Sequence, residues 1–524
     1  MGGNTILETA LMNGWSRRRF LQAAAAAGFS ASVAQALWVK RARAEAKEGG
    51  HLRLGLAGGA TTDSLDPSTY TDTFMVMIGY TTRGNLTEIA LDGSAAPEIA
   101  ESFEGTDGAS KWIFKLRKGV TFSNGKSLTV DDVVSSINYH RGDDSKSGAK
   151  PLLSSIKDVA ADGNDSVVFS LAGGNADFPF VLADYHLNIM PFTNGVPDFQ
   201  VGAGAYQLKE FEPGVRAVFE RNPNSHKKAF LASAEMIAVA DSAARSNALM
   251  TGEVDVINRA ELKTTRLLAK NSDLRVEDVP GRMHYSMPAN TGVQPFDNVD
   301  VRLALKYGID RDVLVKTVLY GHGQAGNDQP ITPSYRYFAK DLSPRPYDPD
   351  MARFHLKKAG LDAVSISLSA ADAAFPGAVD AAVLYAEQAA KAGINIKVVR
   401  EPNDGYWDNV WLKKPFCTAY WGGRPTEDVM LTIAYARDAV WNEAKWDNSR
   451  FNELLVAARA EFDEGKRRGM YEEMQHLVSD DGGVVIPMFA NHVHAIGANV
   501  GHAEQLSGVW ELDGGRCIER WWLV

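Results

Sequence analysis

The chain has 524 residues, of which 45% are hydrophobic and 23% are charged, and its formal net charge at pH 7 is −10. This length is too great for one hydrophobic core, so we expect two or three domains of ordinary globular composition. The net negative charge disfavours nucleic acid and anionic lipid as partners, and no segment beyond the N-terminal region is apolar for long enough to insert into a membrane.

The N-terminal region carries the pattern of an export signal. Residues 16–22 read SRRRFLQ and resemble the twin-arginine export motif, and an Ala-rich segment follows over residues 23–39. Small residues alternate around Ala44 and Ala46, which is typical of a signal peptidase site. An amphipathic helix of a cytoplasmic protein is the alternative. The order of the motif, the apolar segment and the cleavage site favours a twin-arginine signal peptide over residues 1–46 and a mature protein in the periplasm.

Cys417 and Cys517 are the two cysteines of the chain. Neither lies in a lipobox, so we expect no lipid anchor. In an oxidising compartment the two thiols could form a disulfide, but the sequence does not place their Cα atoms within bonding range. Two buried thiols are the favoured alternative.

The first part of the mature chain predicts strands and a helix. Alternating apolar residues indicate half-buried strands around residues 112–116 and 167–171. Between them, Thr129 and Asp132 have the spacing of a capping box, which predicts a helix that begins after Thr129. The apolar face of this helix comprises Val130, Val133, Val134 and Ile137.

Helix and strand patterns continue to the end of the chain. Asn298 and Asp310 are typical caps of two successive helices. Residues 381–392 predict a helix that stops at Gly393, and residues 394–399 predict the next strand. The apolar spacing over residues 451–462 predicts an amphipathic helix. The chain is therefore of the α/β class, without the strict βαβ repetition of a barrel or of a single doubly wound sheet.

Several blocks resemble one protein family. Residues 95–136 read AAPEIAESFEGTDGASKWIFKLRKGVTFSNGKSLTVDDVVSS and are similar to the diagnostic block of the peptide-type (dipeptide, oligopeptide and nickel) extracytoplasmic solute-binding proteins of ABC importers, with Phe103 in place of the usual Trp and Val130 in place of Ala. Further blocks resemble the family in its order: 202–206, 221–224, 249–255, 296–305, 347–350 and 358–360.

The resemblance implies a two-lobed periplasmic-binding-protein-like fold with an extra subdomain in lobe one and two interlobe crossovers. After the signal peptide, the implied segments are 47–95 and 196–283 for lobe one, 96–195 for its extra subdomain, 284–486 for lobe two and 487–524 for a return to lobe one. The crossovers are expected near Gly281–Asn290 and Asp480–Phe489. A solute would bind between the lobes as they close by a hinge motion.

One stretch departs from the family pattern in a way that bears on the ligand. Dipeptide and oligopeptide receptors carry a segment similar to G-W-x-x-D, whose Asp pairs with the α-ammonium of the peptide. Here the stretch reads Tyr420-Trp421-Gly422-Gly423-Arg424, so a guanidinium replaces the carboxylate. This reversal favours an anionic ligand end, as in an acidic or modified peptide, an opine-like conjugate or an acidic sugar. The alternative is a structural ion pair of Arg424 with Glu427 or Asp428 on the loop.

Aromatic residues supply further candidate contacts. Trp407, Trp411, Tyr420 and Trp421 cluster in the sequence of lobe two, and aromatic faces stack on sugars, amides or cations. Burial in the core is the alternative for each Trp other than Trp421. The full set of candidate ligand contacts is Tyr70, Phe74, Asn290, Trp407, Tyr420, Trp421, Gly422 and Arg424.

Catalytic and metal patterns are absent from the sequence. It has no G-x-S-x-G, H-E-x-x-H, phosphate-binding loop or paired C-x-x-C, so we expect no catalytic residues and no cofactor. His492 and His494 could share one strand face and a metal, but no third ligand is linked to them, so we expect no metal site.

The sequence therefore predicts a monomeric periplasmic receptor that delivers a peptide-like or other small solute to ABC permease subunits. Nickel, haem or sugar-conjugate binding by the same fold and a secreted hydrolase are the alternatives.

Overall fold

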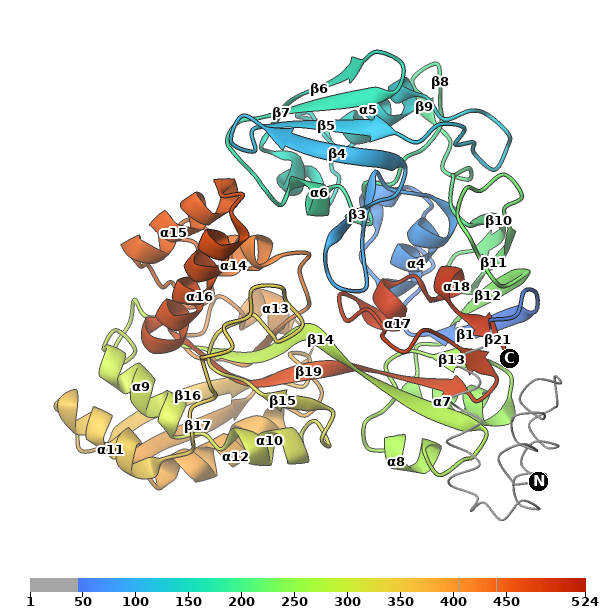
Figure 1. Ribbon diagram of the computed structural model, residues 1–524. Coiled ribbons are helices and arrows are strands. Elements are labelled where there is room, and N and C mark those ends of the chain that lie inside the picture. Colours follow the sequence, from blue (N-terminus) through green and yellow to red (C-terminus); the bar gives the residue numbers. More distant parts are fainter. Residues whose placement is uncertain (1–45, 404, 440) are drawn as a thin grey trace, which may run out of the picture.

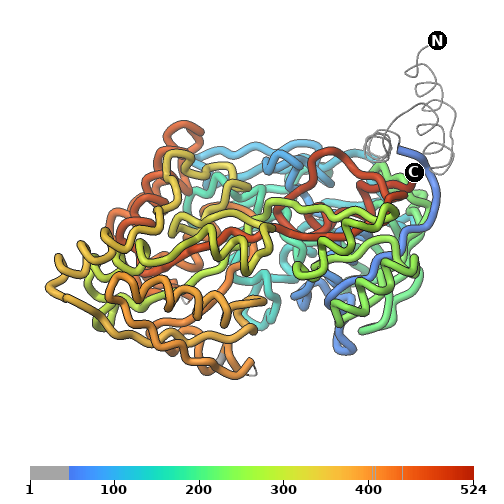
Figure 2. The backbone as a smooth tube through the Cα atoms, turned by 90° about the horizontal axis from the view of Figure 1, so that it is seen from below, coloured from blue at the N-terminus to red at the C-terminus, as the bar shows by residue number. Residues whose placement is uncertain are grey.

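The computed structural model describes residues 46–403, 405–439 and 441–524. Its elements form two lobes at either end of a pair of long strands (Figure 1). Seen from below, the yellow and orange part of the chain fills one end of the molecule, and the blue and green parts fill the other (Figure 2). The expected signal peptide lies, except for its last residue, outside the described residues. No helix within the described ranges is long and apolar enough to cross a membrane.

The two long strands are β14 (Leu274–Pro288) and β19 (Val484–Gly497), which pair antiparallel from one lobe to the other. At about 3.4 Å per residue, each spans roughly 45–50 Å. In lobe one β19 pairs with β13 (Val256–Ile257), and in lobe two β14 pairs with β18 (Ala419–Trp421). The two expected interlobe crossovers are these strands.

Lobe one holds one end of the nine-stranded sheet that contains β14 and β19. Its other elements are β1 (His51–Leu56), α4 (Thr73–Thr82), β10 (Tyr206–Glu212), β11 (Arg216–Arg221), β12 (Ser233–Ala238), α7 (Ser242–Thr251), α8 (Thr265–Leu268), β20 (Val500–Gly501), α17 (Glu511–Gly514), α18 (Cys517–Arg520) and β21 (Trp522–Leu523). Strand β1 runs parallel to both β12 and β13. Nine of the ten residues of α4 are buried, so this helix lies inside the lobe.

The extra subdomain lies at the top of Figure 1 and contains a four-stranded antiparallel sheet in the order β4-β5-β7-β6. Its elements are β4 (Ala100–Thr106), β5 (Lys111–Leu116), α5 (Val130–Tyr139), β6 (Ile156–Asp162), β7 (Ser166–Leu171) and α6 (Phe178–Val181), with the short strands β2 (Thr87–Ile89), β3 (Ala95–Pro97), β8 (Phe192–Thr193) and β9 (Val196–Pro197) around them. The strands predicted around residues 112–116 and 167–171 are β5 and β7, which pair. The capping box is confirmed because Thr129 and Asp132 each accept the backbone N–H of the other.

Lobe two packs helices around a small parallel sheet and around the far ends of the crossovers. Its elements are α9 (Val299–Tyr307), α10 (Arg311–Thr317), β15 (Gly323–Ala325), α11 (Pro349–Lys358), β16 (Val364–Ala370), α12 (Ala378–Ala390), β17 (Ile394–Arg400), α13 (Tyr406–Asn409), β18, α14 (Glu427–Tyr435), α15 (Ser449–Ala460) and α16 (Glu464–Asp481). Strands β16 and β17 run parallel on either side of α12 in the chain. Asn298 and Asp310 cap α9 and α10 as expected.

The helix predicted over residues 451–462 is shorter than expected. It ends as α15 at Ala460, and Phe462 lies between α15 and α16 with 47% of its side chain exposed. The Phe462 ring lies 6.1 Å from that of Trp112 in the extra subdomain. Phe462 fits the apolar spacing of the predicted helix, but it lies outside that helix. Its apolar ring packs against Trp112 of the other lobe.

Both cysteines are buried free thiols in separate hydrophobic cores. Cys417 belongs to the lobe-two core, and Cys517 belongs to the lobe-one core. Burial raises the pKa of each thiol. The alternative of two buried thiols is therefore the one observed.

A second contact joins the lobes besides the crossovers. Asp177, which precedes α6, lies 2.6 Å from a guanidinium nitrogen of Arg467 and 3.3 Å from one of Arg336, both in lobe two. The side chains of Asp177 and Arg467 are only 2% and 3% exposed. The backbone N–H of Ala176 also donates to the Arg459 carbonyl. The extra subdomain and lobe two are thus held together by a buried ion pair, in addition to the ring contact of Phe462.

We predict that Asp177→Ala lowers the free energy of unfolding by about 3–5 kcal/mol, because it leaves the buried guanidinium of Arg467 without its carboxylate. Urea unfolding followed by circular dichroism measures this loss. Glu473→Ala is the matched control, since Glu473 pairs with Arg450 at the surface of one lobe, and it should change stability little. Equal effects of the two substitutions would contradict the prediction.

Candidate ligand-binding site

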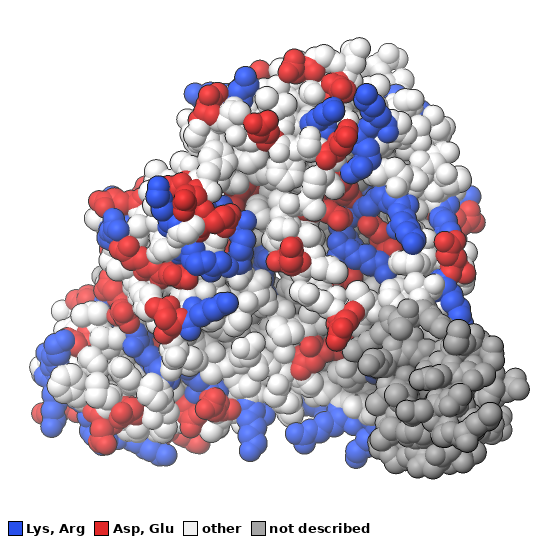
Figure 3. Space-filling model, viewed as in Figure 1, with Lys and Arg blue, Asp and Glu red and all other residues white. Residues whose placement is uncertain are grey.

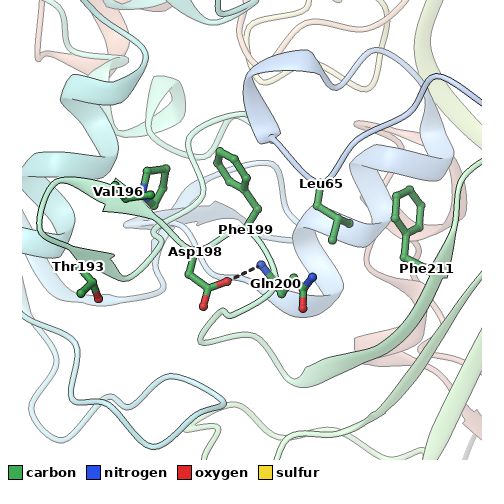
Figure 4. A pocket seen from close by; sticks show the side chains of 8 residues that line it. Leu65, Thr193, Val196, Asp198, Phe199, Gln200 and Phe211 are labelled. Carbon is green, nitrogen blue, oxygen red and sulfur yellow. Dashed lines mark hydrogen bonds between the residues drawn. The ribbon is translucent and has the colours of Figure 1, made fainter.

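One cavity lies on lobe one alone (Figure 4). It measures about 520 Å³ and is lined by Leu65, Phe199 and Phe211 together with the β8–β9 hairpin. In Figure 4 the backbone N–H of Gln200 donates to the carboxylate of Asp198 beside it. Because all its walls belong to one lobe, closure of the lobes cannot enclose a solute there.

Another cavity lies between the lobes. It measures about 300 Å³, and its walls come from α4, from the extra subdomain, from the loop before α14 and from the C-terminal return. The residues of its wall that carry the argument below are Tyr185, Gly423, Arg424, Trp441, Trp510 and Arg516. This is the place where a hinge motion would enclose a small molecule.

Arg424 brings a positive charge without a carboxylate partner into this cavity. Its Nη1 donates only to backbone carbonyls of its own loop, those of Gly422 at 3.2 Å and Gly423 at 3.0 Å. The guanidinium carbon lies 5.4 Å from the Trp421 ring centroid. Within the part of the chain that the structure describes, no carboxylate lies within ion-pair distance of it.

The loop ion pair considered from the sequence does not form, because both carboxylates have other partners. Glu427 accepts the backbone N–H of Tyr337 at 2.6 Å. Asp428 accepts from Arg459 at 3.1 Å. Several N–H groups of the Arg424 guanidinium therefore remain available to a solute.

The charge of Arg424 acts on groups from both walls. Burial and the Arg424 charge lower the pKa of His284, on β14, to about 3, so this imidazole is neutral at pH 7. Burial raises the pKa of the Tyr185 hydroxyl on lobe one, and Arg424 opposes that rise.

Figure 3 shows acidic and basic side chains interspersed over the drawn face. The site is therefore distinguished by the positive charge of Arg424 inside the cavity, and not by an excess of one sign of charge over the drawn face.

The loop that carries Arg424 is fixed by a buried arginine of a crossover strand. Arg282, on β14 and 2% exposed, donates to the carbonyls of Arg424 at 3.1 Å and Pro425 at 2.6 Å. Its guanidinium carbon lies 4.5 Å from the ring centroid of Tyr335, whose hydroxyl accepts the backbone N–H of Arg424. The position of Arg424 is thus tied to the strand that joins the lobes.

Aromatic side chains line the cavity on both sides. On the lobe-one side, the rings of Tyr185 and Trp510 lie 6.0 Å apart, and the Trp510 Nε1 is buried with no hydrogen-bond partner in the described structure. On the lobe-two side, Trp441 is 43% exposed and packs 6.0 Å from Trp421. The candidate contacts predicted from the sequence did not include Tyr185, Trp441 and Trp510, because nothing in the local sequence distinguishes them from aromatic residues of the core.

Three of the candidate contacts lie away from this cavity. Tyr70 and Phe74 are 1% and 0% exposed, because they belong to the lobe-one core, where the Tyr70 hydroxyl accepts from buried Arg83. Asn290 forms a turn after β14, accepting the Gly292 N–H. None of the three lines the cavity, so the structure does not bring these predicted contacts together with Arg424.

Of the remaining aromatic candidates, Trp421 contacts two residues of the cavity wall, Arg424 and Trp441. Trp421 is 4% exposed, and its indole N–H donates to Glu443, which also accepts from Trp411. Burial raises the pKa of Glu443 to about 7, although the two indole donors oppose the rise. Tyr420 and Trp407 are exposed and contact each other with ring centroids 5.6 Å apart. Of the predicted residues, Arg424 lines the cavity and Gly422 accepts its hydrogen bond.

The paired histidines of β19 lie with their rings 6.5 Å apart. The Nε2 of His494 accepts the backbone N–H of Leu512, so that nitrogen is engaged. Among the described residues, no group of three or more His, Cys, Asp or Glu side chains has the arrangement of a metal site.

Two lobes joined by two long strands, with a cavity enclosed between them, define a solute-binding receptor. The family model of bacterial extracellular solute-binding proteins, family 5 Middle, matches residues 94–443, and the chain belongs to this family of receptors for ABC importers.

Individual relatives agree with this assignment. The dipeptide-binding protein of Escherichia coli (strain K12) is 24% identical over 438 residues, which cover 74% of this chain and 80% of that protein. Among solved structures, HbpA2 from Haemophilus parasuis has a TM-score of 0.79 at 18% identity, covering 89% of this chain and 99% of that one. The PBP AgaA from A. tumefaciens R10, in complex with agropinic acid, has a TM-score of 0.74 at 22% identity, covering 91% of this chain and 99% of that one. The two-lobed α/β fold is thereby confirmed.

We predict that Gly423→Ala destabilises the loop by about 1–3 kcal/mol, because an added Cβ would lie 2.8 Å from the Cβ of Arg282 and 3.0 Å from the Val509 carbonyl oxygen. Gly422→Ala is the matched control, since its Cβ would meet only the Arg424 Nη1 at 3.9 Å. Thermal unfolding of both variants measures the difference. A melting temperature of Gly423→Ala equal to that of Gly422→Ala would show that the loop yields without cost.

Proposed function

We propose that this chain captures a small anionic solute between its lobes in the periplasm and presents it to the permease of an ABC importer, acting as a monomer and without a chemical step. Arg424 carries the proposal, because it is a cavity-lining guanidinium without a carboxylate partner among the described residues. A carboxylate on the solute would supply the missing charge, and the planar guanidinium binds carboxylates in a two-point geometry.

The same cavity is poorly suited to the α-ammonium of an ordinary dipeptide. Asp184 is the one carboxylate among the described residues of the cavity wall, and its Oδ1 already accepts from the backbone and the imidazole of His186, at 3.0 Å and 2.6 Å. An ammonium group would therefore meet the charge of Arg424 and a carboxylate that is already engaged through one of its oxygens. Similarity to the E. coli dipeptide-binding protein supports a receptor of this kind, and the cavity chemistry favours an anion over a plain dipeptide.

We predict that Arg424→Ala weakens binding of the natural solute at least about tenfold, because removal of one partner of a charge-assisted contact leaves the solute carboxylate unpaired. Arg424→Lys should restore only part of the affinity, since the planar fork is lost. The solute is identified by mass spectrometry of protein purified from the native host, and isothermal titration calorimetry measures each variant.

Arg437→Ala is the control for this measurement, because Arg437 pairs with Asp447 at the surface of the same lobe. The control should bind as the unaltered protein does. If Arg424→Ala binds the solute as tightly as Arg437→Ala, Arg424 is structural and the anionic-solute proposal fails. Tight binding of a simple dipeptide to the unaltered protein would contradict it as well.

Export by the twin-arginine route is a separate part of the proposal and concerns residues outside the described structure. We predict that Arg17→Lys combined with Arg18→Lys retains the unprocessed precursor in the cytoplasm, because the paired guanidinium groups are the recognition element of the motif. Cell fractionation and immunoblotting measure the distribution. Undiminished mature protein in the periplasm would rule out this route.

A further inference from the structure

Two aromatic walls, one on each lobe, face the cavity that holds Arg424. Trp441 belongs to lobe two, whereas Tyr185 and Trp510 belong to the extra subdomain and the C-terminal return. Tyr185 itself contacts the ring of the neighbouring His186 in a tilted arrangement, with ring centroids 4.2 Å apart. These aromatic surfaces from the two lobes line the same cavity. Aromatic surfaces on opposite sides favour a flat, apolar body between them, because offset and edge contacts between rings contribute beyond simple burial.

The wall offers N–H donors of one side chain to a ligand. They are the N–H groups of the Arg424 guanidinium beyond those that its own loop engages. The other basic groups of the wall are already neutralised. Arg516 pairs with Glu98 and Glu519.

Six aliphatic side chains also line the cavity, those of Val76, Ile89, Leu152, Val429, Ile433 and Val509. These side chains offer no partner to the hydroxyl groups of a sugar acid or to the backbone groups of a peptide, and burying such groups without partners is unfavourable. The volume of about 300 Å³ lies at the lower end of the range for small-molecule sites, roughly 300–1,000 Å³. A compact solute with few polar groups fits these surroundings best.

We infer that the solute is a small planar aromatic carboxylate, with its carboxylate on Arg424 and its ring between Trp441 and the Tyr185–Trp510 pair. The inference rests on the proposed function and narrows it from small anions in general to aromatic acids.

The test is a panel of probes titrated by calorimetry into the mature protein after extensive dialysis. Benzoate, phenylacetate and indole-3-acetate are the aromatic acids, and cyclohexanecarboxylate carries the same charge on a ring that is not planar. Benzyl alcohol keeps the aromatic ring without the charge, whereas glucuronate and Ala-Ala represent sugar acids and dipeptides. We expect at least one aromatic acid to bind roughly tenfold or more tightly than cyclohexanecarboxylate, since two aromatic walls act on it.

Variants of the walls give a second measurement. Trp441→Leu removes the lobe-two ring but keeps an apolar side chain, and it should reduce the preference for the aromatic acid to about threefold or less. Trp407→Leu is the matched control, because Trp407 is 37% exposed in the same lobe but does not line the cavity, and the preference should be unchanged.

The outcomes separate the two proposals. If aliphatic and aromatic acids bind equally and both depend on Arg424, the aromatic inference is overturned and the anionic-solute proposal stands. If glucuronate is the only probe that binds, and its binding depends on Arg424, the aromatic inference is likewise overturned and the anionic-solute proposal stands. If Ala-Ala alone binds, or if binding of every acid is unaffected by Arg424→Ala, the anionic-solute proposal fails. Absence of binding by all three aromatic acids at millimolar concentration also overturns the inference.

Discussion

The antiparallel pairing of β14 and β19 is the constraint on which the arrangement of the lobes depends. Its register runs from Leu274 opposite Gly497 to Pro288 opposite Val484, but it shifts between Pro280 and Met283. An irregularity of this kind bends a strand and re-aims the side chains at that point. Arg282 lies within this interval and reaches the loop that carries Arg424. A change in the bend of the crossover would therefore move the charged loop, so the hinge and the binding group are mechanically connected.

The charge of Arg424 couples closure of the lobes to binding of an anionic solute. Enclosing an unpaired guanidinium between the lobes is unfavourable, because the charge loses water without gaining a partner. An anionic solute reverses this balance by pairing with Arg424 as the water is displaced. Closure is opposed by that charge when the cavity is empty, whereas the ion pair of Asp177 with Arg467 favours it. A solute can shift the equilibrium only by its difference in affinity for the two arrangements, and the charge of Arg424 supplies such a difference.

The sequence predicted the scaffold well because its signals are local. The capping box at Thr129 and the caps at Asn298 and Asp310 act within one turn of each helix, and the alternation in β5 and β7 reflects one buried face. Arg424 could be placed in the cavity because the family pattern fixes its loop. Tyr185 and Trp510 could not, since they meet only when the C-terminal segment returns to lobe one. The burial of Tyr70 and Phe74 in the lobe-one core could not be predicted either, because an aromatic residue near a loop has the same local pattern whether it faces the core or the solute.

Under the proposed function, selectivity resides in few side chains, so the scaffold does not have to change for the solute to change. A carboxylate at the position of Arg424 would attract an ammonium group, and the guanidinium repels it, so one residue both favours anions and rejects cations. The fold does not have to change, because Arg282 and Tyr335 hold this loop through groups of its backbone. The side chain at position 424 can therefore vary in charge while its backbone stays attached to the crossover. Aromatic walls on both lobes then select the body of the solute, independently of the group that selects its charge.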